Sequence, residues 1–173
     1  IIHKNETAIN YKCLVLEMYP QTHFLFPLFI GLLLYRVGIF SWKLALFAGI
    51  VGIFIDIDHY IEHIIHSKKN KFSLRATWNN SIKLHKFNQR SFIHYWDGAV
   101  ILSFLFLIVS LWYPFIALAL AIGYFSNLLL DVPNFAKKTI LKLKIGELYF
   151  RESWVEVLFC VLLIIGCIIV LLL

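Results

Sequence analysis

The sequence predicts an all-α fold, a polytopic membrane helix bundle of about five transmembrane helices with a cytoplasmic N-terminus. Three observations predict it. Of the 173 residues 61% are hydrophobic, with a mean hydropathy of +0.80. Only 15% are charged, against about a quarter in soluble domains. The apolar residues also form continuous runs rather than alternating with polar ones, as membrane helices do. We expect one transmembrane domain, 18–173, after a polar tail, 1–17.

Each predicted helix rests on an apolar run close to the roughly 20 residues that a span requires. The run from Gly98 to Leu130 has 33 residues without a charge, which is too long for one span. Trp112 and Pro114 lie inside it, and an interfacial aromatic residue beside a helix-breaking proline predicts a tight hairpin. The predicted spans are 24–40, 45–65, 93–112, 114–131 and 153–173.

The basic residues predict the orientation. With five spans, the N-terminal tail and the loops 67–91 and 132–152 share one side of the membrane. They hold 14 of the 16 Lys and Arg residues, and only Arg36 and Lys43 fall on the other side. The positive-inside rule therefore places the tail and both loops in the cytoplasm. Because the basic residues fall between apolar runs rather than on one exposed face, we expect the lipid bilayer, and no nucleic acid, as partner.

The acids and histidines gather at the same side. His23 begins the first span, Asp56 to His66 end the second, His94 and Asp97 begin the third, and Asn127 and Asp131 end the fourth. Ionisable residues within membrane segments are costly and mark functional sites by default. Four helix ends therefore bring carboxylates and imidazoles to one leaflet, where we expect the functional site.

Spacing within each helix suits shared coordination. Residues three or four apart lie on one helix face, which aligns Asp56 with His59 and pairs His94 with Asp97. Facing helices that project such pairs inward are how helix bundles build carboxylate–histidine metal sites. Mixed His and Asp ligands suit zinc, with manganese or iron as alternatives. The sequence thus predicts a divalent metal ion as cofactor.

Four motifs resemble those of the membrane-bound metal-dependent hydrolase family, small multi-span inner-membrane proteins of bacteria and archaea. Thr22-His23 is similar to the family's Thr/Gly-His, and Asp56-Ile57-Asp58-His59 to its D-x-D-H. The segment 89–97 resembles H-R-x-x-x-H or H-x-W-E, and 123–131 resembles G-Y-x-x-H-x-x-x-D. The sequence departs from the pattern at two histidines, where it has Gln89 and Asn127, and at a proline and a glutamate, where it has Ile55 and Asp97.

The resemblance implies a membrane-embedded, metal-dependent hydrolase of the cell (inner) membrane that acts at the cytoplasmic leaflet on a phosphoester or lipid-like substrate. The basic loops would then hold anionic headgroups. The implied metal ligands are Asp56, His59, His94, Asp97 and Asp131. The implied general base or ligand-orienting residues are Asp58, Glu62 and His23.

Two other functions fit the same residues. A catalytically inactive scaffold or partner-binding protein would use the His/Asp cluster as a structural polar network that ties the helices together. A metal or proton carrier would also place Asp and His in the membrane. A carrier should have polar residues that continue through the bilayer toward the outer face. The last three spans show no such continuation toward that face, which disfavours a carrier.

Overall fold

The chain folds into helices and one short β-hairpin. A computed structural model describes residues 19–67, 70–79, 92–131, 139–145 and 148–173. In these ranges it does not describe the side chains of His59, Glu62 and the hairpin residues between 139 and 152. The tail 1–17, Gln89 and much of both basic loops therefore lie outside the described residues. The elements are α1 (Pro20–Arg36), α2 (Trp42–Phe54), α3 (Ile57–His66), α4 (Leu74–Asn79), η2 (Phe92–His94), α5 (Trp96–Ser110), α6 (Pro114–Leu130), β1 (Thr139–Ile145), β2 (Leu148–Ser153) and α7 (Trp154–Leu172).

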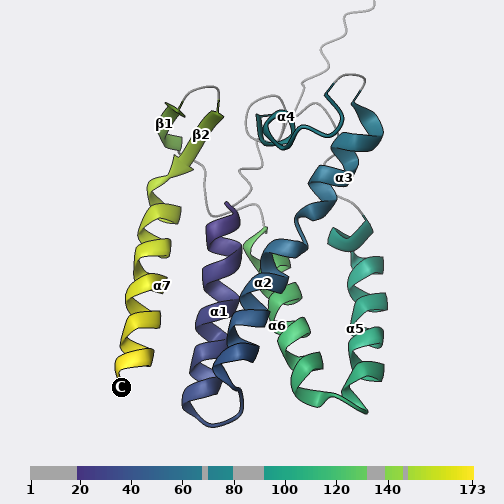
Figure 1. Cartoon of the computed structure of the whole chain (residues 1–173), viewed down its shortest axis with the longest axis vertical. Helices are drawn as coiled ribbons and strands as arrows, with labels where there is room; N and C mark the ends of the chain where they lie inside the picture. Colours follow the sequence, from purple (N-terminus) through teal and green to yellow (C-terminus); the bar gives the residue numbers. More distant parts are fainter. Residues whose placement is uncertain (1–18, 68–69, 80–91, 132–138, 146–147) are drawn as a thin grey trace, which may run out of the picture.

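The long helices lie side by side, with α1, α2 and α6 in the centre, α7 packed on α1, and α5 packed on α6 (Figure 1). The hairpin, α3 and α4 lie at one end of the bundle, and the chain ends at the other (Figure 1). The predicted hairpin at Pro114 is confirmed, because α5 ends at Ser110 and α6 begins at Pro114.

Within the part of the chain that the structure describes, one helix, α7, is long and apolar enough to cross a membrane, with a mean hydropathy of 3.2 over its apolar window. Three further apolar helices, α2, α5 and α6, have 10–17 residues. At 1.5 Å per residue, the 13 residues of α2 reach about 20 Å, less than the roughly 30 Å of a hydrocarbon core. The helical fold agrees with the sequence, and the number of crossings stays a prediction.

The predicted span 45–65 is broken in two. Helix α2 ends at Phe54, Ile55 and Asp56 form a turn, and α3 begins at Ile57. Non-helical backbone at membrane depth is tolerated where it lines a protein cavity or a polar site. The break places Asp56 at the joint between two helices rather than along one.

The two-stranded antiparallel hairpin of β1 and β2 was not predicted. Leu141 pairs with Glu152, Lys142 with Arg151, and Leu143 with Phe150. The run Leu141-Lys142-Leu143-Lys144-Ile145 alternates apolar and basic residues, which is the strand pattern. In the prediction of membrane orientation these lysines counted only as basic residues of the loop 132–152.

Small residues bring the three central helices together. A Cβ atom at Gly52 of α2 would collide with the carbonyl oxygen of His23 on α1. A Cβ atom at Gly123 of α6 would lie 2.6 Å from Cγ1 of Val51. Close helix contact through small residues is typical of membrane bundles. These close contacts bring α2 against α1 at His23 and against α6 at Gly123.

A buried glutamate attaches α7 to α1. Glu156 is 4% exposed, and its Oε1 accepts hydrogen bonds from the backbone N–H of Tyr19 at 2.6 Å and from the hydroxyl of Thr22 at 3.0 Å. The carboxylate thus caps the N-terminus of α1, where the helix dipole favours a negative charge. Its own helix begins with a second cap, because Ser153 Oγ accepts from the N–H of Glu156 at 3.1 Å.

We predict that Glu156→Ala lowers the free energy of unfolding by about 1–3 kcal/mol, because it leaves two buried donors without this acceptor. Glu156→Gln keeps an acceptor oxygen and should cost less. Thermal unfolding of the purified protein in detergent measures both changes, with Leu158→Ala, at a 60% exposed position of the same helix, as control. Equal loss in the Ala and Gln variants would contradict the capping role.

Candidate metal centre

Three predicted ligands converge where four elements meet. Asp56 lies in the turn between α2 and α3, His94 ends η2, and Asp131 follows α6. One side-chain ligand atom from each lies within 4.8 Å of the other two. All three residues were predicted as metal ligands from sequence.

The imidazole of His23, from α1, joins these residues in an alternating ring of two histidines and two aspartates. His23 Nε2 lies 3.9 Å from Asp56 Oδ2 and 3.5 Å from Asp131 Oδ1. His94 Nε2 lies 3.9 Å from Asp56 Oδ1 and 3.4 Å from Asp131 Oδ2. Each carboxylate therefore faces both imidazoles. The separations exceed the roughly 2.7–3.2 Å of good N–H···O hydrogen bonds, so the ring leaves room at its centre.

The ring is buried. The side chains of His23 and His94 are 1% and 2% exposed, and those of Asp131 and Asp56 are 8% and 16% exposed. Asp131 lies at the C-terminus of α6, where the helix dipole disfavours a carboxylate. The two imidazoles that face it provide the opposing partners there.

Asp58 contacts Nδ1 of His94, the imidazole nitrogen that faces away from the ring. Its Oδ2 lies 2.8 Å from His94 Nδ1, and its side chain is 3% exposed. A carboxylate at that nitrogen fixes the hydrogen on Nδ1 and leaves Nε2 to face Asp56 and Asp131. This is the carboxylate–histidine arrangement that orients metal-ligating histidines in proteins.

Asn127 contacts Nδ1 of His23, the nitrogen that faces away from the ring, and it presents an amide NH2 group there instead of a carboxylate. Its amide nitrogen donates to the carbonyl of Gly52 at 2.9 Å and to Asp56 Oδ1 at 2.8 Å. These two acceptors fix the orientation of the amide and use both of its hydrogens. An amide nitrogen accepts no hydrogen bond, so its contact with His23 Nδ1, at 3.2 Å, disfavours a hydrogen on Nδ1. The hydrogen of neutral His23 then sits on Nε2, directed at the carboxylates. His23 therefore directs an N–H toward the ring, and Nε2 of His94 is the imidazole nitrogen that faces both aspartates.

His94 precedes α5, and its surroundings favour the protonated form. Burial lowers its pKa, but the hydrogen bond to Asp58 and the negative charges of Asp58, Asp131 and Asp56 raise it more. The pKa of His94 therefore lies above its ordinary value. A proton and a metal ion would compete for Nε2, as they do at metal sites generally.

Of the other predicted ligands and catalytic residues, Asp97 does not join the cluster, and the predictions for His59 and Glu62, on α3, fall on side chains outside the described residues. Asp97 is exposed in the first turn of α5. Asp97 lies away from His94 because the chain is not one helix there: η2 ends at His94, and extended Tyr95 caps α5. The i, i+3 face rule does not apply across that change.

The fold and the cluster define a helical membrane protein with a buried His/Asp site at one end of its bundle. The chain belongs to the YdjM inner membrane protein family, whose model matches residues 18–141, and it is accordingly an inner membrane protein. Comparisons with curated proteins and with solved structures give no match. The match includes every ring residue and excludes α7.

We predict that the purified protein binds about one zinc or manganese ion per chain, as expected for a single three-ligand site. His94→Ala and Asp131→Asn should each abolish stoichiometric binding, measured by elemental analysis after dialysis. Asp97→Asn is the control and should keep the metal. Loss of metal in the Asp97 variant with retention in the other two would reverse this assignment in favour of the ligand expected from sequence.

Asp58→Asn should weaken metal binding by about 10–100-fold, the usual cost of removing the partner of a ligating histidine. It should leave the stoichiometry at saturation unchanged, because Asp58 contacts His94 and not the ring centre. Competition with a fluorescent zinc chelator measures the affinity. An unchanged dissociation constant would show that Asp58 does not orient the ligand.

Proposed function

We propose that the protein is a membrane-embedded, metal-dependent hydrolase that acts on phosphoesters at the cytoplasmic leaflet. The observation that carries the proposal is the convergence of Asp56, His94 and Asp131 within 4.8 Å. Three protein ligands with one open position are characteristic of catalytic zinc sites, whereas structural sites use four.

The geometry of the three residues fits a metal ion. Ligand atoms at 2.0–2.2 Å in tetrahedral geometry lie about 3.3–3.6 Å from one another. His94 Nε2 is already 3.4 Å from Asp131 Oδ2, and 3.9 Å from Asp56 Oδ1. The first separation is within this range, and a small inward movement of Asp56 would bring the second into it.

The charge of the cluster supports a cation. Asp56, Asp58 and Asp131 contribute three carboxylates against two imidazoles, so these five residues carry a negative sum even with both rings protonated. Like charges held together in a poorly solvated site repel one another strongly. A divalent ion at the ring centre would offset that repulsion.

The residues then have distinct roles in phosphoester hydrolysis. A divalent ion supplies Lewis acidity that makes water nucleophilic near neutral pH. Water adds to phosphorus, the P–O ester bond breaks, and the departing alkoxide takes a proton. The proton that the water loses goes to this alkoxide. His23, directed at the ring through Nε2–H, would donate a hydrogen bond to the phosphate oxygens. Asp58 and Asn127 position the two imidazoles.

The membrane arrangement belongs to the same proposal. We infer that α1, α2, α5, α6 and α7 cross the bilayer, with the ring at the cytoplasmic end of the bundle. The outward faces of α5 and α7 support this, since Phe104, Leu107 and Leu158 are 60–65% exposed. The 14 basic residues of the tail and long loops support the cytoplasmic placement.

A purely structural polar network is the alternative, and it would hold the same residues at hydrogen-bonding distance. The ring separations of 3.4–3.9 Å favour the metal site over that network.

We predict that the protein hydrolyses bis(p-nitrophenyl) phosphate in detergent when zinc or manganese is supplied, and that a chelator abolishes the activity. Asp56→Ala and His94→Ala should each lower kcat by at least about 100-fold, since each removes a ligand. Lys43→Ala, beside Trp42 at the opposite end of α2, is the control. Metal-loaded protein without activity on phosphomonoesters and phosphodiesters would favour the structural network.

A further inference from the structure

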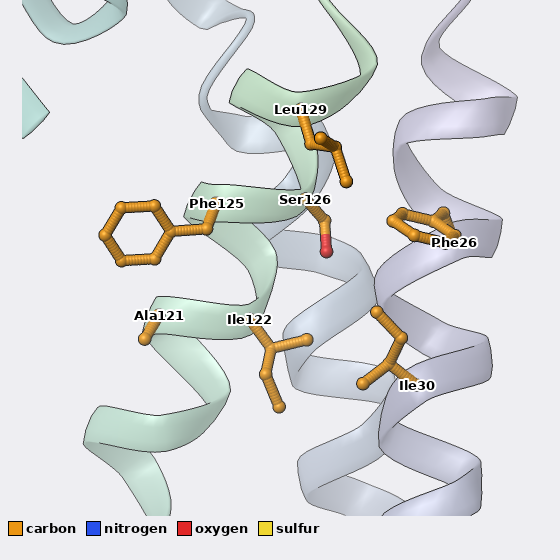
Figure 2. A pocket seen from close by; sticks show the side chains of 7 residues that line it. All are labelled: Phe26, Ile30, Ala121, Ile122, Phe125, Ser126 and Leu129. Atoms are coloured by element: carbon orange, nitrogen blue, oxygen red, sulfur yellow. The ribbon is translucent and has the colours of Figure 1, made fainter. Parts of the chain in front are cut away.

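An apolar groove runs along the bundle between α1 and α6 and has a volume of about 340 Å³. Phe26 and Ile30 form one wall, and Ile122, Ser126 and Leu129 form the other (Figure 2). Figure 2 shows α2 behind these side chains, so the groove opens on the face of the bundle away from α2. It is a lateral opening, on the side of the bundle rather than at its end.

The groove lies next to the ring along two helices. His23, Phe26 and Ile30 are spaced i, i+3 and i+7 on α1, so the histidine and the groove wall share one helix face. On α6, the groove residues Ile122, Ser126 and Leu129 share a face that adjoins the one with Asn127 and Asp131, and Leu129 lies within one helical turn of the end of α6. From the level of Leu129 to that of Ile122, α6 rises about 10 Å. The groove therefore runs from beside the ring down the side of the bundle.

A second groove, of about 510 Å³, lies between α5 and α6 and shares Ala121 and Phe125 with the first. Its lining includes Ser110 and Pro114, at the end of the bundle opposite the ring. Along α6 it reaches no closer to the ring than Phe125, whereas the first groove reaches Leu129. The two grooves are alike in their apolar lining and differ in their connection to the site, which makes the second a built-in control.

We propose that the α1–α6 groove holds the hydrocarbon chain of a phospholipid while its phosphoester lies at the ring, so that the substrate is a membrane phospholipid; this rests on the proposed function. In an inner membrane protein, an apolar lateral groove faces acyl chains rather than water. A buried polar site at its head suits the phosphate of the same molecule. The groove and the ring lie next to each other on α1 and α6, so one amphiphilic molecule can occupy the groove with its chain and the ring with its phosphoester.

The binding test uses phosphatidylcholine vesicles that contain a trace of phosphatidylglycerol with a photoreactive diazirine in its acyl chain. After reconstitution and illumination, labelled residues are located by mass spectrometry. We expect labelling to concentrate on Phe26, Ile30 and Ile122, and to fall by at least about 10-fold in Ile30→Trp, since the added ring displaces several buried methylenes. Leu118→Trp, in the second groove, should leave it unchanged.

Two outcomes would overturn the groove assignment. Labelling spread evenly over the groove and over outward positions such as Phe104 would mean bulk lipid only. A disulfide-linked dimer of an Ile30→Cys variant would mean that a second copy of the chain covers the groove. Leu129→Trp guards against misfolding of Ile30→Trp, because it narrows the same groove at a position that is 56% exposed.

The catalytic test separates this inference from the proposed function. Wild-type protein should cleave dipalmitoyl phosphatidylglycerol with a kcat/KM at least about 10-fold above that for the dihexanoyl lipid, because more methylenes are buried. Ile30→Trp should remove that preference, whereas Leu118→Trp, in the second groove, should keep both that preference and the hydrolysis of bis(p-nitrophenyl) phosphate. Hydrolysis without any chain preference would overturn the groove alone. Groove labelling without any hydrolysis would overturn the function and the lipid's role as substrate.

Discussion

The buried amide of Asn127 is the interaction on which the rest of the site depends. It is fully buried and contacts the backbone of Gly52 on α2, the carboxylate of Asp56 after α2, and the imidazole of His23 on α1. Three segments are thereby joined through one nitrogen of α6. Because a buried polar group must find partners, this amide fixes how closely the central helices approach and where their polar side chains meet.

The same amide makes the two histidines of the ring inequivalent. A donor, Asn127, faces the outer nitrogen of His23, and an acceptor, Asp58, faces the outer nitrogen of His94. The inner nitrogen of His23 therefore carries a hydrogen, and that of His94 faces Asp56 and Asp131. A histidine at position 127, as in the resembled family motif, would offer a ligand nitrogen instead. In the proposed metal site, the asparagine would leave three protein ligands and an open position.

Much of the site was predictable from sequence because of topology. The positions of acids and histidines at the ends of apolar runs were enough to predict that Asp56, His94 and Asp131 lie together, without any knowledge of packing. Asp97 was grouped with His94 by helical spacing, and the backbone departs from a helix between them. The break at Asp56 interrupts the face on which it was aligned with His59. Sequence periodicity locates helices, but it does not show where a helix is interrupted.

Glu156 lay beyond sequence reasoning for a different reason. It is a single acid at the start of a long apolar run, which looks like an interfacial residue. Its role as a cap of α1 depends on a contact between segments 137 residues apart. The only sequence signal was Ser153 three residues before it, the spacing of a helix-capping box. Groove walls are likewise products of packing, since their residues come from two helices distant in sequence.

The central claim is that Asp56, His94 and Asp131 bind one metal ion while His23 does not. X-ray absorption spectroscopy of the zinc-loaded protein in detergent tests it directly, since it reports ligand type and distance. The account predicts one imidazole and carboxylate oxygens at about 2.0–2.2 Å, with the imidazole signal lost in His94→Ala and retained in His23→Ala. A spectrum with no imidazole, or one whose imidazole signal disappears in the His23 variant and persists in the His94 variant, would contradict it.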